Sequence, residues 1–226
     1  MKLALFDLDH TLLPIDSADS WTRYLVRVGG LDVAAHDRRL REFGAGYHAG
    51  SFDVDGYLAY QMGLLASFRH ADLVGWRDRF VAERVAPNVR PEARALIDAH
   101  RGDESLVALV TGTNRFVTGP IGALFGVPDV LAVEPERGPD GEFTGRYVGT
   151  HTYREGKVRI VEQFLEAHGT RLDRVADSTF YSDSVNDLPL LERVDNPVVT
   201  NGDAALRRIA AERGWRTLDL FELAPR

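Results

Sequence analysis

The sequence predicts an α/β protein whose mainly parallel sheet is covered by helices on both faces, in three layers, with a small block of helices inserted after the first strand. From residue 88 onward, short apolar runs of strand length alternate with amphipathic stretches of helical length, the pattern of a doubly wound sheet. The first apolar run, residues 2–6, is instead followed by roughly seventy residues with helical periodicity and no convincing strand.

The composition is that of a folded chain and excludes several classes of protein. The 226 residues are 44% hydrophobic and 27% charged, enough for a sizeable core and a second, smaller unit. A net charge of −7 argues against a nucleic-acid surface, and the absence of cysteine excludes disulfides, a thiolate nucleophile and cysteine-bound zinc. The first apolar run is too short for a signal peptide, and no stretch is long enough to span a membrane. We therefore expect a cytoplasmic protein with neither nucleic-acid nor membrane partners.

The inserted block has clear helix boundaries. Pro14 ends the first apolar stretch, Asp16 and its neighbours supply N-cap residues, and Gly29 with Gly30 ends the first helix. Three more helices are expected at residues 31–47, 53–67 and 71–85. The prolines between residues 87 and 91 mark a boundary. We expect residues 1–13 and 88–226 to form the sheet domain and residues 14–87 a helical cap.

The remainder of the chain supplies the other strands and helices of the sheet domain. Strands are expected at residues 105–110, 130–133, 178–182, 197–200 and 217–220. Helices are expected at residues 91–100, 114–125, 154–168, 186–193 and 203–213. Asp140-Gly141 and Thr144-Gly145 indicate a hairpin between the second and third of these helices.

Two aspartates follow the first strand. Asp7 and Asp9 stand at the end of a buried run, where an unpaired charge is costly, so the pair requires a cation or a proton. A metal site with hard oxygen ligands meets this requirement. The alternative is a solvated turn, where aspartate is also common. Because ligands of open α/β sheets bind at the carboxyl ends of the strands, the inserted helices are placed to cover this point.

The ends of other strands carry matching chemistry. Thr111 and Gly112 follow the next buried strand and combine a hydroxyl with backbone N–H groups at a helix start. This combination suits a bound phosphate or carboxylate, and it also suits an ordinary N-cap turn. Lys157 lies in the first turn of a helix, where a cation opposes the helix dipole. Only two of the 27 basic residues are lysines, which makes a solvated surface role for Lys157 less attractive.

Asp183 and Asp187 follow a further strand, four residues apart. Asp183 alone is explained by N-capping, and Asp187 by complementing the helix dipole. Together with the aspartates of the first strand they make four carboxylates at two strand ends of one sheet. A shared site is therefore the better interpretation.

These residues, in this order, resemble the four motifs of haloacid dehalogenase-like phosphatases, and the match spans most of the sheet domain. The motifs are Asp7-Leu8-Asp9-His10-Thr11, Thr111-Gly112, Lys157 and Asp183-Ser184-Val185-Asn186-Asp187. The inserted helices resemble the small cap of the branch that contains phosphoserine phosphatase. The tail from Tyr181 to Leu191 and the stretch from Gly141 to Lys157 resemble a bacterial subfamily of that branch, in which some members are described as histidinol-phosphatase-like.

The resemblance implies a magnesium-dependent hydrolase of a small phosphorylated metabolite. Asp7 would form an aspartyl-phosphate and Asp9 would act as general acid and base. Thr111, Gly112 and Lys157 would bind the phosphoryl oxygens. Asp7, the carbonyl of Asp9 and Asp183 would hold Mg²⁺, with Asp187 close by or acting through water.

Three residues depart from the family pattern. His10 stands where small residues are frequent, and it either faces the substrate or covers the site. Ser182 replaces a glycine and suggests a different turn. Asp16 stands where phosphoserine phosphatases carry a glutamate that reads the substrate's amino group, and its shorter side chain puts phosphoserine in doubt as the substrate.

Other functions stay open at this point. A phosphotransferase or mutase would use the same chemistry with another acceptor, and a non-catalytic module would bind phospho-ligands without a general acid. Helical spacing assigns most of the cap aromatics to the core and leaves room for one or two of them to face the site, without indicating which: Trp21, Tyr47, Tyr57, Tyr60, Phe68 and Trp76. The sequence is compatible with a monomer or a homodimer.

Overall fold

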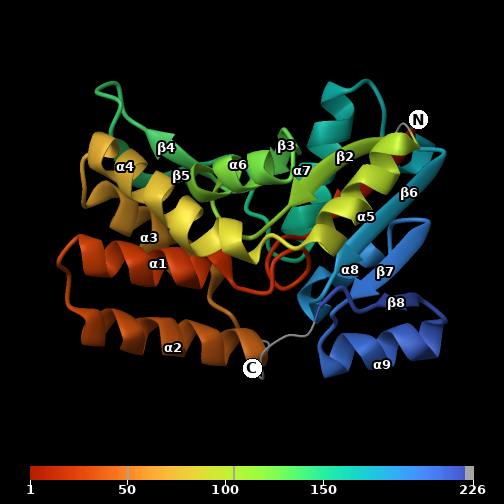
Figure 1. Cartoon of the computed structure of the whole chain (residues 1–226), viewed down its shortest axis with the longest axis horizontal. Coiled ribbons are helices and arrows are strands. Elements are labelled where there is room, and N and C mark those ends of the chain that lie inside the picture. The colour runs from red at the N-terminus through yellow and green to blue at the C-terminus, as the bar shows by residue number, and fades with distance from the viewer. Residues whose placement is uncertain (50, 104, 222–226) are drawn as a thin grey trace.

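The computed structural model describes residues 1–49, 51–103 and 105–221. Within them, six parallel strands form one sheet in the order β3–β2–β1–β6–β7–β8 (Figure 1). The strands are β1 (Lys2–Phe6), β2 (Ser105–Val110), β3 (Asp129–Leu131), β6 (Asp177–Ser182), β7 (Asn196–Thr200) and β8 (Arg216–Leu218). The predicted parallel sheet is confirmed, and β1 occupies its centre.

Helices cover both faces of this sheet. The helices are α5 (Pro91–Gly102), α6 (Arg115–Leu124), α7 (Glu155–Ala167), α8 (Leu188–Leu191) and α9 (Ala204–Arg213). Because successive side chains of a strand point to opposite faces, Ala4 and Phe6 pack with α5 and α6, whereas Leu3 and Leu5 pack with α7, α8 and α9. This arrangement is the predicted three-layer fold.

The segment after β1 is helical, as predicted, and no strand interrupts its described residues. It contains α1 (Ser17–Val28), α2 (Val33–Ala49), α3 (Val54–Ala66) and α4 (His70–Phe80), followed by a π turn at Val81–Val85 and a 3₁₀ turn at Ala86–Asn88. Trp21 of α1 packs its ring 5.4 Å from Phe80 and 6.1 Å from Phe116 of α6. These contacts join the inserted helices to the helices of the sheet, and we interpret the insert as a cap.

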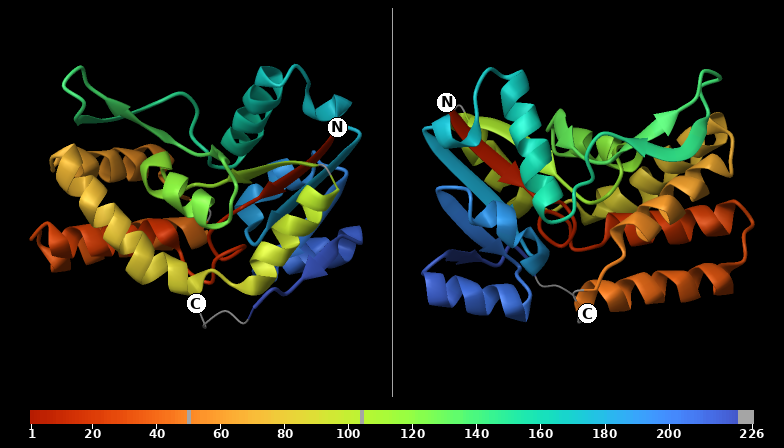
Figure 2. Two further views of the ribbon diagram at one scale, coloured as in Figure 1. Left: turned by 45° about the horizontal axis from the view of Figure 1, so that its top comes forward. Right: turned by 180° about the vertical axis from the view of Figure 1, so that it is seen from behind.

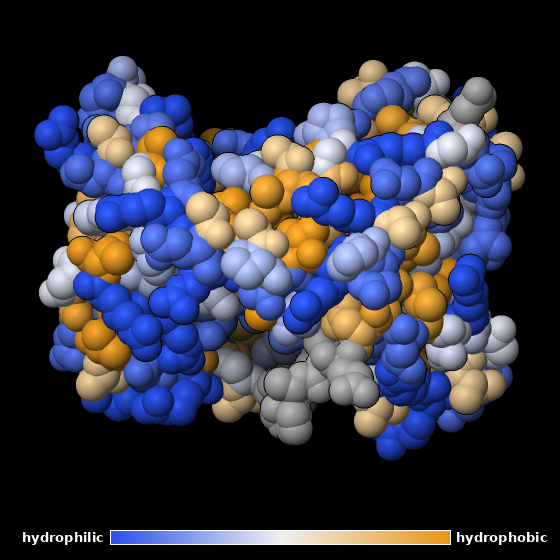
Figure 3. All heavy atoms as spheres, in the orientation of Figure 1, coloured by the Kyte–Doolittle hydropathy of each residue, from blue (hydrophilic) through white to orange (hydrophobic). Residues whose placement is uncertain are grey.

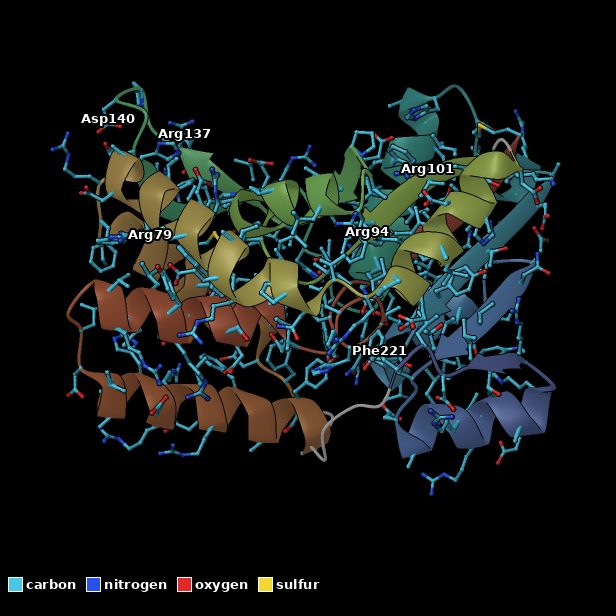
Figure 4. All side chains as sticks on the ribbon, viewed as in Figure 1. Arg79, Arg94, Arg101, Arg137, Asp140 and Phe221 are labelled. Carbon is cyan, nitrogen blue, oxygen red and sulfur yellow. The ribbon has the colours of Figure 1, made fainter. Side chains whose placement is uncertain are left out.

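An antiparallel hairpin of β4 (Glu134–Arg137) and β5 (Phe143–Val148) lies beside the inserted helices (Figure 2). Glu142 accepts a hydrogen bond from the backbone N–H of His70 at 2.6 Å, and the rings of His70 and Phe143 lie 5.2 Å apart. Figure 4 labels Arg137 and Asp140 at the hairpin tip, on the side of α4. The sequence placed this hairpin in the sheet domain, and its packing partners include both the inserted helices and α6, whose Phe116 ring lies 5.2 Å from that of Phe143.

The face drawn in Figure 3 is largely hydrophilic over α2 and α9, with apolar residues interspersed between polar ones over its centre. Among the described residues, no helix is both long and apolar enough to cross a membrane.

The ends of β1, β2 and β6 meet beneath the inserted helices. The backbone N–H of Asp7 donates to Tyr181 O at 2.9 Å, and that of Thr111 to Leu131 O at 3.0 Å. The ladders thus continue into the residues that follow the strands and fix where their side chains begin. The loop after β1 lies between the inserted helices and the sheet (Figures 1 and 2).

Candidate functional site

A cleft of about 1510 Å³ opens between the inserted helices and the ends of the strands. Its walls include the predicted residues Asp7, Asp9, His10, Asp16, Gly112, Lys157, Asp183 and Asp187. Thr111 is buried and holds the following turn, because its hydroxyl accepts a hydrogen bond from Thr113 N at 3.2 Å. Phe221, labelled in Figure 4, lines the cleft from the C-terminal segment.

Lys157 lies between two carboxylates at the bottom of this cleft. Its Nζ is 2.6 Å from Asp7 Oδ1 and 2.6 Å from Asp187 Oδ2, and all three side chains are buried. Burial by itself would lower the pKa of Lys157, but the charges of Asp187 and Asp7 raise it above its usual value. Lys157 is therefore a charged, buried partner of the carboxylate that follows β1, and not a solvated surface lysine.

The carboxylate of Asp7 is also perturbed by its burial. Burial raises its pKa to about 6, even though the nearby ammonium of Lys157 opposes this shift. Its second oxygen, Oδ2, accepts a hydrogen bond from Thr11 Oγ1 at 3.2 Å. Cationic or hydrogen-bonding groups thus contact both oxygens of Asp7, which orients its carboxylate in the cleft.

Asp9 is held by a different set of donors. The backbone N–H of Ser17 donates to Asp9 Oδ1 at 2.8 Å, and Thr113 Oγ1 donates to Oδ2 at 2.9 Å. Ser17 Oγ in turn donates to Thr113 Oγ1 at 3.1 Å. Burial and then the charge of Asp16 raise the pKa of Asp9 well above its usual range. Asp9 is therefore oriented by groups from the first cap helix and from the turn after β2, in surroundings that favour its protonated form.

The aspartates after β6 do not act as helix caps. Ser184, rather than Asp183, caps the short turn that follows by accepting from Asn186 N at 3.2 Å. The side chain of Asp187 forms no cap and is directed to Lys157. Both carboxylates belong to the cleft. The N-cap alternative for Asp183 is removed, whereas Asp187 lies in a first turn, where its charge also complements the helix dipole.

The carboxylate and carbonyl oxygens at this end of the sheet are ligands that suit a magnesium ion, although the carboxylate side chains do not form a preassembled metal site. Among the described residues no group of three or more carboxylate or imidazole side chains is arranged to hold a metal. Asp7 Oδ2 and Asp183 Oδ1 nevertheless both approach one hydroxyl, Thr11 Oγ1, at 3.2 and 3.4 Å. Magnesium needs only one or two carboxylates beside water and phosphate oxygens, and this pair fits that requirement.

Three further predicted residues, His10, Asp16 and Gly112, also border the cleft. His10 has a left-handed backbone (φ 59°), and its carbonyl accepts from Asn201 Nδ2 at 2.9 Å. Asp16 caps α1 by accepting from Asp19 N at 2.8 Å, the role its position predicts. A Cβ on Gly112 would meet no atom within 4 Å, so the fold itself does not require glycine there. The open space leaves its backbone accessible to a ligand.

The sequence did not predict the roles of several residues that border or support the site. Thr113 and Ser17 hold Asp9, and Ser182 donates to Asp187 Oδ2 at 2.6 Å. Tyr47 of α2 reaches across the cleft, where its hydroxyl lies 2.9 Å from Ser184 Oγ. The only available signal was that Ser182 departs from the family glycine. Helical spacing had assigned Tyr47 to the core.

A family model described as haloacid dehalogenase-like hydrolase matches residues 4–192. A histidinol-phosphatase of Neisseria meningitidis is 38% identical over 220 residues, which cover 96% of this chain and 98% of that protein. A phosphoserine phosphatase of Mycobacterium tuberculosis is 31% identical over 224 residues, with 98% and 71% covered.

Solved structures show the same fold. A Bordetella pertussis protein of unknown function superimposes with a TM-score of 0.91 at 43% identity, covering 97% of this chain and 99% of that one. A substrate-bound phosphoserine phosphatase gives a TM-score of 0.69 at 17% identity, covering 98% and 94%.

Proposed function

The chain belongs to the haloacid dehalogenase-like hydrolases, and from this premise we propose that it is a phosphatase that hydrolyses a phosphomonoester of a small cytoplasmic metabolite through a phosphoaspartate at Asp7. The observation that carries the proposal is the arrangement of two aspartates with different surroundings. Asp7 is held by the ammonium of Lys157, and Asp9 by Thr113 and Ser17. Such a pair suits one nucleophile and one general acid.

In the first step a carboxylate oxygen of Asp7 attacks phosphorus. The bond between phosphorus and the alcohol oxygen breaks, and Asp9 gives its proton to that oxygen. In the second step water attacks the phosphoaspartate and Asp9 takes up a proton from it. The bond from phosphorus to Asp7 then breaks, which releases orthophosphate and restores both side chains.

The phosphoryl oxygens need positive partners in this scheme. Lys157 is the permanent cation beside Asp7, and the backbone N–H of Gly112 borders the cleft at the start of α6. Thr111 supports that turn through its hydrogen bond with Thr113 N. We therefore assign phosphate binding to Lys157 and Gly112, with Thr111 shaping the loop around them.

Asp7, the carbonyl of Asp9 and Asp183 would hold Mg²⁺. When bound, the ion would offset the negative charge that the nucleophile and the phosphate bring together. Asp187, which the sequence placed near the metal, has Lys157 and Ser182 as its hydrogen-bonding partners. We assign it to holding Lys157.

The substrate's alcohol portion faces an acidic and aromatic wall. Asp16 and Asp19 line the cleft near Asp9, and Tyr57 adds an aromatic surface beside them. Burial and then the charge of Asp16 raise the pKa of Tyr57, which keeps its hydroxyl neutral. These surroundings favour an alcohol that carries a protonated amine, as phosphoserine and histidinol phosphate do.

The covalent step is tested by quenching the enzyme during turnover of a ³²P-labelled ester. We expect label on the protein that is stable in acid and released at alkaline pH, as an acyl phosphate requires, and no label on Asp7→Asn. Rapid hydrolysis without labelled protein in either would replace the covalent route with direct attack by water. Transfer of label to an added alcohol would favour a phosphotransferase, and tight ester binding without turnover a binding module.

A further inference from the structure

Asp187 is fixed in place by a hydroxyl as well as by Lys157. Its Oδ2 accepts from Ser182 Oγ at 2.6 Å and from Lys157 Nζ at 2.6 Å. Asp187 is buried, and Ser182 is fully buried as the last residue of β6. A serine on a central strand therefore sets the position of the oxygen that binds the ammonium.

The hydrogen of the Ser182 hydroxyl is committed to that contact. The backbone N–H of Ser184 donates to Ser182 Oγ at 3.2 Å, so the hydroxyl accepts one hydrogen bond and has its only hydrogen left to donate. The carboxylate of Asp187 is the acceptor. The direction of the bond is thus determined by its surroundings, and both its partners lie on the loop that carries Asp183.

Lys157 depends on this arrangement because its stem is flexible. A lysine ammonium on four methylene groups takes its position from its partners, and here these are Asp7 Oδ1 and Asp187 Oδ2. A shift of Asp187 moves the ammonium relative to the attacking carboxylate. Displacements of about 1 Å in such sites cost roughly 100-fold in rate.

From this geometry we propose that Ser182 is a positioning residue for Lys157, acting through Asp187. The sequence suggested only an altered turn at this position. The structure instead offers a continuous chain of contacts from Ser182 through Asp187 and Lys157 to Asp7. The inference rests on the proposed function, because it assigns the chain of contacts to phosphoryl transfer.

The test compares Ser182→Ala, Ser182→Gly and Ser182→Thr with the wild-type protein. Alanine and glycine both remove the hydroxyl without adding volume, and glycine is the residue that the family pattern carries at this position. We expect both to lower kcat/KM for a single ester by about 10- to 100-fold and to weaken competitive inhibition by orthophosphate. Threonine keeps the hydroxyl and should restore kcat/KM to within about threefold. Wild-type kcat/KM and orthophosphate inhibition in the glycine variant would overturn the proposal.

Ser178→Ala is the matched control, because Ser178 is a buried serine at the other end of β6. Its hydroxyl donates to Asp195 Oδ2 at 2.7 Å, far along the strand from Lys157. This variant should lower the melting temperature by an amount similar to Ser182→Ala and leave kcat/KM unchanged. An equal loss of kcat/KM in both variants would mean that the effect comes from the strand.

A double-mutant cycle with Lys157→Met tests the route of the effect. If Ser182 acts through Lys157, then Ser182→Ala changes orthophosphate affinity by less than about twofold once the ammonium is absent. An undiminished effect of Ser182→Ala in the Lys157→Met background would overturn the proposal. Calorimetric titration of orthophosphate reads this cycle without turnover, so it still decides the role of Ser182 if wild-type protein hydrolyses no ester and the proposed function fails.

Discussion

Replacing Thr113 with valine removes one of the two groups that orient the proposed general acid. Thr113 is buried, and its hydroxyl donates to Asp9 Oδ2 at 2.9 Å while it accepts from Ser17 Oγ at 3.1 Å. Valine has nearly the same shape but no hydroxyl, so only the backbone N–H and the side chain of Ser17 remain to hold Asp9. The lost hydrogen bond is worth about 1–2 kcal/mol. If the transition state for phosphoaspartate formation loses that amount, kcat/KM falls by about 5- to 30-fold.

Comparing two leaving groups makes this prediction specific to proton donation. An alkyl phosphate releases a basic alkoxide and needs the proton of Asp9, so it should show the whole decrease. An aryl phosphate such as p-nitrophenyl phosphate releases a stable phenolate and should lose only about twofold or less in kcat/KM, which reports formation of the phosphoaspartate and not the second step that both esters share. Initial rates of orthophosphate release give both values.

The matched control for Thr113→Val is Thr118→Val. Thr118 is also buried, but its hydroxyl donates to Asn114 O at 3.1 Å within α6 and has no hydrogen bond to Asp7 or Asp9. It should leave the ratio of alkyl to aryl kcat/KM unchanged. An equal loss on both esters in Thr113→Val, or no loss on the alkyl ester, would refute the role assigned to Thr113.

Two further predictions concern cap contact and stability. Tyr47→Phe removes the hydroxyl that lies 2.9 Å from Ser184 Oγ across the cleft. KM should therefore rise by about fivefold with little change in melting temperature. An unchanged KM in steady-state kinetics would show that this contact has no role in closing the cap over the substrate. His100 has a lowered pKa because of burial, and its Nε2 lies 2.7 Å from the Tyr181 hydroxyl. Folding therefore favours neutral His100, and its contribution to stability is complete above its unfolded pKa of about 6.5 and is lost as the pH falls below that value. In thermal melts from pH 7.5 to 5, His100→Gln should lose less stability on acidification than wild type, and an identical pH dependence would contradict the assignment.

The fold was predictable because its signals are local. A buried strand such as Ser105–Val110 is a continuous apolar run, and α1 lies between an N-cap aspartate and a pair of glycines. The packing of the β4–β5 hairpin against the inserted helices could not be predicted from such local signals. The contact between Glu142 and His70 joins residues 72 positions apart and depends on how the cap sits on the sheet.

The site residues likewise fall into those that local sequence signals predict and those that depend on long-range packing. Asp7, Asp9 and Asp183 follow strands whose carboxyl ends meet at one edge, so strand positions alone predict that they gather. Lysine is scarce in this chain, and this scarcity indicated a role for Lys157 other than that of a solvated surface residue. Apart from Ser182, which replaces the family glycine, the residues that hold these side chains in place have no distinguishing feature in the sequence. The Tyr47 hydroxyl meets a serine 137 residues away, and neither helical spacing nor residue type distinguishes it from a core aromatic.

Phosphate release is the measurement that tests the central claim most directly. Wild-type protein and Asp7→Asn are assayed with phosphoserine, histidinol phosphate, sugar phosphates and an aryl phosphate, each with Mg²⁺ and after chelation. We expect wild-type protein to release orthophosphate only with the metal, fastest from an ester whose alcohol carries an amine. We expect Asp7→Asn to release none while keeping the wild-type circular dichroism spectrum. Turnover by Asp7→Asn at the wild-type rate would contradict the account, and so would folded wild-type protein that releases phosphate from no ester.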